Sequence, residues 1–183
     1  MTALISGIKT TPVLVPFKRP PVTASGSVRE LPLVLLDLET DAGLIGRAYL
    51  FVFQKSMLKP TVGCVAAIEE LVRGMSADPE QVDPLLRRRL RLLDIHGILG
   101  QALSGVDMAL WDIRAKSEGL SLATVLGKQR DYVQAYNSCG LWLEKDDPEK
   151  LADQAQELLA EGGFSAVKLR LGYESFKDDL AAV

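Results

Sequence analysis

Two basic side chains lie two residues apart in the stretch AVKLRLG, which spans residues 166–172. Its composition predicts a short strand, in which successive side chains alternate between the two faces. Lys168 and Arg170 therefore share one face, and the apolar residues that alternate with them share the other. Two cations that point in one direction suit an anionic ligand such as a carboxylate. The alternative is that both are solvated side chains on a strand with one open face.

The cation at position 170 is an arginine, which limits the chemistry it can do. A guanidinium keeps its proton under almost any condition found in proteins, so Arg170 is a poor general base. Its planar fork of N–H donors instead suits carboxylates. We therefore predict an electrostatic role for Arg170 rather than a proton-accepting one.

Other residues that could do chemistry are isolated in the sequence. Tyr136 and Ser138 share one face of the strand-like stretch DYVQAYNSCG. His96 is the only histidine, and without a nearby cysteine or histidine it cannot form a metal cluster, so we predict a helix-end residue. Cys64 and Cys139 form no CxxC pair, which indicates two reduced thiols.

Asp107, Trp111 and Asp112 resemble a paired-carboxylate motif, but they lie in the middle of a predicted helix. This helix is apolar around most of its circumference, which favours burial on several sides. We expect both carboxylates to accept hydrogen bonds from neighbouring backbone rather than to act as acid and base.

The first 130 residues predict strands followed by helices. Residues 4–16 are β-rich, and two apolar runs flank the turn sequence TDAG within residues 30–53, which is typical of a hairpin. The Pro-, Ser- and Gly-rich residues 18–29 between them predict an irregular loop, and long loops of this kind are often functional.

Helical patterns follow this hairpin. Apolar residues recur at helical spacing from Ile68, and Asp78 with Pro79 has the sequence of an N-cap and first helical residue. Residues 98–119 predict a long helix that ends at a glycine, and residues 120–127 predict a short one.

Beyond residue 130 the pattern changes to strand, helix, strand and the beginning of a helix. The middle helix, within residues 146–163, has Asp147 as its predicted N-cap. This order implies a parallel sheet. Two strands cannot bury such a sheet on both faces, so we expect an α+β domain at 1–130 and an incomplete α/β domain at 131–183.

The overall composition excludes several classes of partner. The 183 residues carry a net charge of −3, so no basic excess points to nucleic acid or an anionic membrane. The basic run RRRLRLLD at 87–94 predicts a solvated helix face, with a patch for a partner as the alternative. No signal-peptide pattern begins the chain and no apolar run reaches the roughly 18 residues of a membrane span, so we predict a cytoplasmic protein.

The order of these motifs resembles a known superfamily. PLVLLDLETDAGLIGRAYLF, SGVDMALWDIRAKSEGLSLATVLG, VQAYNS and AVKLRLG, in this order, are similar to the enolase superfamily and most of all to its mandelate racemase/muconate lactonizing enzyme branch. The resemblance covers the whole chain. It implies an α+β capping domain, with a three-stranded antiparallel sheet and a helical bundle, followed by the truncated first βαβ portion of a (β/α) barrel.

The resemblance also implies a chemistry. Members abstract a proton alpha to a carboxylate and stabilise the enediolate on Mg²⁺, whose ligands we expect beyond Val183. The substrate would be a small hydroxycarboxylate or a sugar acid. The enzyme would be an isomerase or a lyase, and it would form a homo-oligomer. The 183-residue chain alone would be inactive. The alternative is a non-catalytic capping or oligomerisation module.

Individual roles follow from the resemblance. Lys168 would help to neutralise the substrate carboxylate, and position 170 would be a general base if it were lysine. Ser138 would lie near metal and substrate, or be a strand-end turn hydroxyl. The loop from Val22 to Val28, together with Phe53, would line the cap side of the pocket, although Phe53 could equally pack in the core. Arginine at 170 favours a one-base dehydration of a sugar acid over a two-base racemisation.

Overall fold

The computed structural model describes residues 3–24, 26–93, 95–141 and 148–183, which form two compact units. Unit 1 takes in the chain up to Val15 and then Leu31–Gln129. Unit 2 comprises Pro16–Glu30 and Arg130–Val183. No helix in the described ranges is both long enough and apolar enough to cross a membrane.

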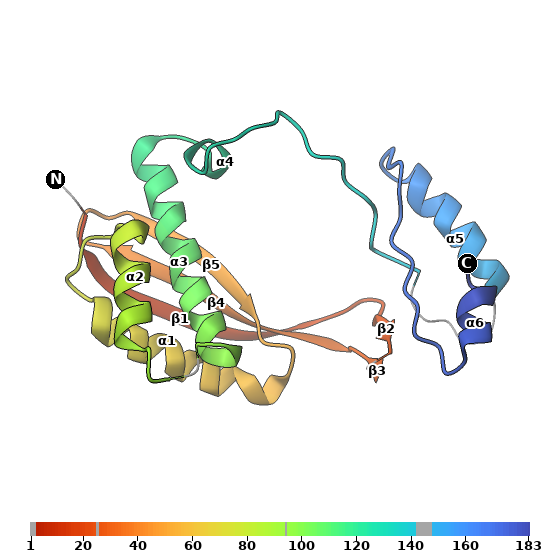
Figure 1. Ribbon diagram of the computed structural model, residues 1–183, viewed down its shortest axis with the longest axis horizontal. Coiled ribbons are helices and arrows are strands. Elements are labelled where there is room, and N and C mark those ends of the chain that lie inside the picture. The colour runs from red at the N-terminus through yellow and green to blue at the C-terminus, as the bar shows by residue number, and fades with distance from the viewer. Residues whose placement is uncertain (1–2, 25, 94, 142–147) are drawn as a thin grey trace. The chain divides into compact units, whose positions relative to one another are not determined.

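The strands come first in the chain and the helices follow (Figure 1). The strands are β1 (Ile5–Pro16), β2 (Val22–Thr23), β3 (Gly26–Ser27), β4 (Glu30–Thr40) and β5 (Ile45–Phe51). The helices are the 3₁₀ turn η1 (Lys55–Met57), α1 (Leu58–Val72), α2 (Pro79–Arg89), α3 (Gly97–Glu118), α4 (Leu122–Val125), α5 (Pro148–Ala160) and α6 (Phe176–Ala181).

The three-stranded sheet of unit 1 has the order β1-β4-β5, and β4 pairs with β5 in an antiparallel register. The predicted TDAG turn joins these two strands. Thr40 closes it, because its N–H and its Oγ1 both donate to the Leu44 carbonyl at 3.0 and 2.9 Å. The hairpin that the sequence predicts is therefore confirmed.

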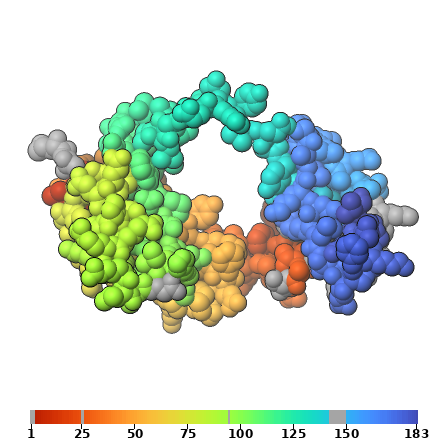
Figure 2. Space-filling view, viewed as in Figure 1, coloured from red at the N-terminus to blue at the C-terminus, as the bar shows by residue number. Residues whose placement is uncertain are grey.

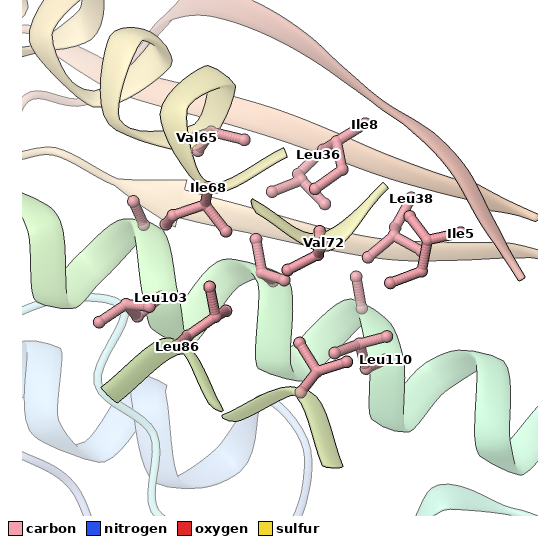
Figure 3. Close-up of a cluster of buried hydrophobic side chains, with 14 of the residues drawn as sticks. Ile5, Ile8, Leu36, Leu38, Val65, Ile68, Val72, Leu86, Leu103 and Leu110 are labelled. Atoms are coloured by element: carbon pink, nitrogen blue, oxygen red, sulfur yellow. The ribbon is translucent and has the colours of Figure 1, made fainter. Parts of the chain in front are cut away.

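The core of unit 1 lies between the sheet and the helices. Alternate residues of β4, namely Val34, Leu36 and Leu38, are fully buried, as period-two alternation requires. Side chains of β1, α1, α2 and α3 point into the same cluster (Figure 3). In the space-filling view, α2 and α3 present adjoining side-chain surfaces, coloured yellow-green and green (Figure 2). Each such fully buried aliphatic side chain stabilises the fold by roughly 1.5–3 kcal/mol.

The helix termini largely follow the predicted signals. The Asp78 carboxylate accepts from the Glu80 N–H at 3.0 Å, and Pro79 is the first residue of α2. α3 begins after His96 and ends at Gly119, so both predicted ends are confirmed. α1, however, begins at Leu58, ten residues before the apolar pattern predicts. Pro60, Gly63 and β-branched residues weaken the local helix propensity there, and burial on the core overrides it.

The two aspartates of α3 have structural partners. Asp112 Oδ2 accepts from the backbone N–H of Arg47 at 2.8 Å and from Lys116 Nζ at 2.6 Å, so it fastens α3 to β5 as expected. Asp107 lies near the side chains of Asp83, Arg87 and Trp111, which all act on its pKa. Burial, followed by the nearby Asp83 carboxylate, raises the pKa of Asp107 above its usual value.

Unit 2 has its own small core beneath α5. Leu141, Leu151 and Leu158 are buried there, and Val167 and Leu169 pack against them. The predicted helix is confirmed in its extent, whereas its predicted N-cap, Asp147, lies outside the described residues.

The two predicted strands of unit 2 reduce to a single parallel bridge between Asn137 and Val167. The Asn137 N–H donates to the Ala166 carbonyl at 3.0 Å, and the Lys168 N–H donates to the Asn137 carbonyl at 2.9 Å. The ladder stops there because the next N–H in register, that of Cys139, donates to Asn137 Oδ1 at 3.0 Å instead. The predicted parallel direction is correct, but the predicted strand lengths are not, and the described residues close no barrel.

The predicted irregular loop at 18–29 contains the two-residue hairpin β2–β3, in which Val22 pairs with Ser27. The Val28 N–H donates to the Pro21 carbonyl at 2.9 Å and steadies the base of this hairpin. Two-residue strands carry too few alternating side chains to leave a pattern in the sequence.

Candidate active site

The candidate site is built on the segment that carries Lys168 and Arg170. Val167 and Leu169 face the small core under α5, while the Lys168 side chain is exposed and Arg170 is half-buried. The side chains of Lys168 and Arg170 therefore point away from the apolar face of the segment, as the alternation predicts.

Asn137 holds the neighbouring segment in place. It is only 5% exposed, and its side-chain N–H groups donate to the Leu158 carbonyl at 3.0 Å and to Glu161 Oε2 at 3.3 Å. Its side-chain oxygen accepts from Cys139, and its backbone bridges to the Lys168 segment. A buried amide with all these partners fixes one conformation of the chain.

Both terminal nitrogens of the Arg170 guanidinium donate to backbone carbonyls of the same chain. Its Nη1 donates to the Gly140 carbonyl at 2.8 Å and its Nη2 to the Ser138 carbonyl at 3.2 Å. Ser138 is half-buried and Gly140 is buried. The structure thus brings Ser138 and Arg170 together directly, through the serine backbone.

The turn after this segment is held by Asp179 of α6. Its Oδ1 accepts from the N–H groups of Gly172 and Tyr173, at 2.8 and 3.0 Å. These two backbone hydrogen bonds lower the pKa of Asp179, because they favour the charged form. Gly172 itself has φ +120°, and a Cβ there would lie 2.9 Å from the Cβ of Ala24 in the β2–β3 hairpin.

The remaining predicted site residues are distributed over both units. Val22 and Val28 are half-buried in the 16–30 segment of unit 2. Phe53 belongs to unit 1, has φ 60° and is 68% exposed, and its ring centre lies 4.3 Å from that of Phe51. Phe53 is therefore outside the core of unit 1. Tyr136 is 55% exposed in unit 2.

The residues present do not fit Mg²⁺. Within the described ranges, no group of three or more His, Cys, Asp or Glu side chains is placed to hold a metal ion. Mg²⁺ is bound in proteins by carboxylates together with water or substrate oxygens. The site described here is therefore a pair of cations on a strand-like segment, with no metal ligands beside them in the described part of the chain.

Three residues that hold the candidate site in place through hydrogen bonds escape prediction from the sequence: Asn137, Gly140 and Asp179. Asn137 leaves a weak signal, because Asn before Ser, Cys and Gly favours a turn in which the side chain accepts a backbone N–H. Gly140 acts through its carbonyl, and a backbone acceptor has no signature in the residue type.

Comparison with known proteins decides the family. Residues 5–127 match the mandelate racemase/muconate lactonizing enzyme N-terminal domain. This chain belongs to the mandelate racemase/muconate lactonizing enzyme family. The resemblance to the enolase superfamily that the motifs indicate is thereby confirmed, together with the α+β fold of the N-terminal half.

Members with a known activity or structure align with this chain over most of its length. L-talarate/galactarate dehydratase of Salmonella typhimurium is 28% identical over 155 residues, covering 82% of this chain and 37% of that protein. D-galactarolactone cycloisomerase of Agrobacterium fabrum is 30% identical over 156 residues, covering 82% and 39%. An enolase from Bradyrhizobium, solved with magnesium and mandelic acid, is 33% identical with a TM-score of 0.89, covering 100% of this chain and 49% of that one.

The chain spans about two fifths of the length of these curated relatives and half of the solved structure. The relatives are acid-sugar dehydratases and cycloisomerases of the mandelate racemase/muconate lactonizing enzyme branch.

Proposed function

We propose that this chain is the N-terminal part of an enzyme that abstracts the proton alpha to the carboxylate of a sugar acid. The observation that carries the proposal is the exposed Lys168 beside the anchored Arg170, in a chain that belongs to a family whose relatives act on acid sugars. In this proposal Lys168 faces the substrate carboxylate. Ser138, Val22 and Val28, all residues of unit 2, contribute to the walls of the same site.

The proposed role of Lys168 rests on charge and exposure. The Lys168 side chain is exposed on the face opposite the α5 core. Its backbone N–H donates to the Asn137 carbonyl, which fixes the position of the backbone that carries the ammonium group. A cation held near a substrate carboxylate offsets the charge that builds up when the alpha proton leaves.

Dehydration is favoured over two-base racemisation by the contacts of Arg170. A racemase of the two-base kind needs a proton acceptor on each face of the alpha carbon. The guanidinium of Arg170 is a poor acceptor and is bound to two carbonyls of its own chain. In the dehydration, a base takes the alpha proton, and the β-hydroxyl then leaves as water with a second proton. The resulting enol tautomerises to a 2-keto-3-deoxy acid. A cycloisomerase that forms and opens a lactone is the alternative that the relatives support.

The metal and the proton acceptor would have to come from outside the described residues. The Bradyrhizobium enolase was solved with magnesium, which supports Mg²⁺ as the metal of the proposed reaction. We also propose that the complete protein is a homo-oligomer, because the paired Leu35 and Tyr49 leave apolar surface exposed on the sheet.

The test is product formation by a protein that carries this chain together with a complete barrel. With Mg²⁺ present, it is offered galactarate, talarate, galactonate, arabinonate and mandelate, and 2-keto acid is measured. We expect at least one sugar acid to be converted and mandelate to be left unracemised. Lys168→Met should lower kcat/KM by about 100-fold or more, because removing one electrostatic contact at a developing charge has that size of effect.

The matched control is Lys9→Met, which removes an exposed lysine from β1 of unit 1 and should leave the rate unchanged. Racemisation of mandelate without any dehydration would contradict the proposal. So would equal rates for Lys168→Met and the unaltered protein.

A further inference from the structure

Arg170 links two segments of unit 2, the one around Asn137 and the one that carries Lys168. Its two hydrogen bonds begin where the backbone hydrogen bonds between these segments end. The last ladder bond runs from the Lys168 N–H to the Asn137 carbonyl. The Cys139 N–H turns away to the Asn137 side chain, so the backbone provides no further link from that residue. Beyond this point the Arg170 side chain reaches the carbonyls on both sides of Cys139.

These carbonyls need a donor. Gly140 is buried, and a buried carbonyl without a hydrogen bond destabilises the fold. Charge-assisted hydrogen bonds from a guanidinium are about twice as strong as neutral ones, and one planar fork can serve two acceptors at once. A lysine at position 170 would bring a single nitrogen and could not hold both carbonyls in the same geometry.

We propose that Arg170 is a positioning residue, which fixes the Ser138–Gly140 segment against the segment that presents Lys168. The role rests on the proposed function, since it is the Lys168 ammonium and the Ser138 side chain whose spacing it sets. Arg170 acts through its two carbonyl contacts rather than through its charge. Loss of the fork removes the two hydrogen bonds that lie beyond Asn137, so the Ser138–Gly140 segment can hinge there.

The first arm of the test measures backbone amide exchange and needs no substrate. The Cys139 N–H lies within the Ser138–Gly140 segment and donates to Asn137, and the Leu141 N–H follows that segment and donates to Gln154. Arg170→Met and Arg170→Lys should each speed exchange at these two amides by tenfold or more. Exchange in α3 of unit 1 should stay unchanged, which would show that the variants remain folded. Lys168→Met, the matched control, removes the neighbouring cation and should leave both amides slow.

The second arm uses the complete enzyme and separates geometry from charge. Arg170→Lys should lose about as much kcat as Arg170→Met, on the order of 100-fold, as expected for misplacement of a catalytic group by about 1 Å. Ethylguanidinium should restore part of the activity of Arg170→Ala, whereas ethylammonium should not. A role confined to folding would give no such selective rescue.

Two results would overturn the positioning role. One is amide exchange that stays slow in both variants. The other is Arg170→Lys with nearly full activity and slow exchange, which would show that charge alone matters. If the unaltered enzyme turns over no sugar acid, the proposed function fails, while the exchange arm still decides the role of Arg170.

Discussion

Gly46 of β5 lies so close to Ala109 of α3 that a Cβ on residue 46 would be 2.0 Å from the Ala109 carbonyl oxygen. The atom in the way is backbone, which cannot swing aside as a side chain would. On either side of this contact, the Arg47 N–H donates to Asp112, and Lys116 Nζ donates to the Ile45 carbonyl at 2.7 Å. The strand and the helix are thus held at a separation that only glycine allows.

Gly46→Ala should therefore destabilise unit 1. The helix or the strand must shift, and overpacking of this kind costs about 1–3 kcal/mol or more. Chemical denaturation followed by far-UV circular dichroism measures the loss. Gly63→Ala is the matched control, because a Cβ there meets nothing within 4 Å and alanine should stabilise the helix by about 0.5–1 kcal/mol. Equal stability of Gly46→Ala and the unaltered chain would show that the packing is looser than described.

Asn137→Ala should loosen unit 2 while leaving unit 1 intact. The substitution removes the hydrogen-bond partners of the Leu158 carbonyl and the Cys139 N–H. The first of these hydrogen bonds is buried, and an unsatisfied buried group costs about 1–3 kcal/mol. Amide exchange in α5 and at Lys168 should become faster by tenfold or more. Gln134→Ala, which removes an exposed hydrogen bond to Ser165, serves as the control and should have little effect. Slow exchange in Asn137→Ala would mean that the α5 contacts hold the unit without Asn137.

The parts of the fold that the sequence predicts are those where many residues repeat one signal. The β4–β5 hairpin has an apolar, β-type run on each side of TDAG, and α2 has both an N-cap and a proline at its start. Prediction from the sequence fails where the hydrogen bonds of a single side chain determine the local structure. A single side chain, Asn137, takes the Cys139 N–H and shortens the expected parallel strands to one bridge.

The sequence predicts on which face of the 166–172 segment Lys168 lies, but it does not predict the hydrogen-bond partners of Arg170. Period-two alternation correctly places Lys168 away from the α5 core. Arg170 donates to the backbone carbonyls of Gly140 and Ser138, which lie 30 and 32 residues earlier in the chain. Every residue has a backbone carbonyl, so the residue type does not predict such a partner. The sequence therefore predicts a cation suited to a carboxylate, but it does not predict that the Arg170 guanidinium also donates to carbonyls of its own chain.

Asp107→Asn should make unit 1 more stable at neutral pH. Burial and Asp83 raise the pKa of Asp107 above its ordinary 3.8, so the folded state holds this proton more tightly than the unfolded chain does. The resulting stability is present below the ordinary pKa and is lost as the pH rises through the raised one. The neutral amide removes this loss.

Thermal unfolding between pH 3 and pH 7 checks the sign of this effect. The Tm of Asp107→Asn should exceed that of the unaltered chain at pH 7, and the difference should shrink toward pH 3. Asp153→Asn, on the exposed face of α5, is the control. A lower Tm for Asp107→Asn at pH 7 would show that the contacts with Arg87 and Trp111 outweigh the burial.

The 17–30 segment should be more mobile than the hairpin beside it in sequence. It has few large apolar anchors, and its hairpin β2–β3 has only two residues in each strand. Amide exchange at Val22–Ser27 should be complete well before exchange in β4 and β5. Equal protection of the two regions without a ligand would count against a lid role for this segment.

Solvent deuterium incorporation tests most directly whether the reaction uses one base and whether Arg170 accepts no proton. A protein that carries this chain and a complete barrel is incubated in D₂O with Mg²⁺ and its sugar acid, and the alpha carbon of recovered substrate is analysed by stereospecific NMR. We predict incorporation from one face only, with Arg170→Met slowing that exchange without changing its face. Incorporation from both faces, with one of them abolished by Arg170→Met, would contradict it.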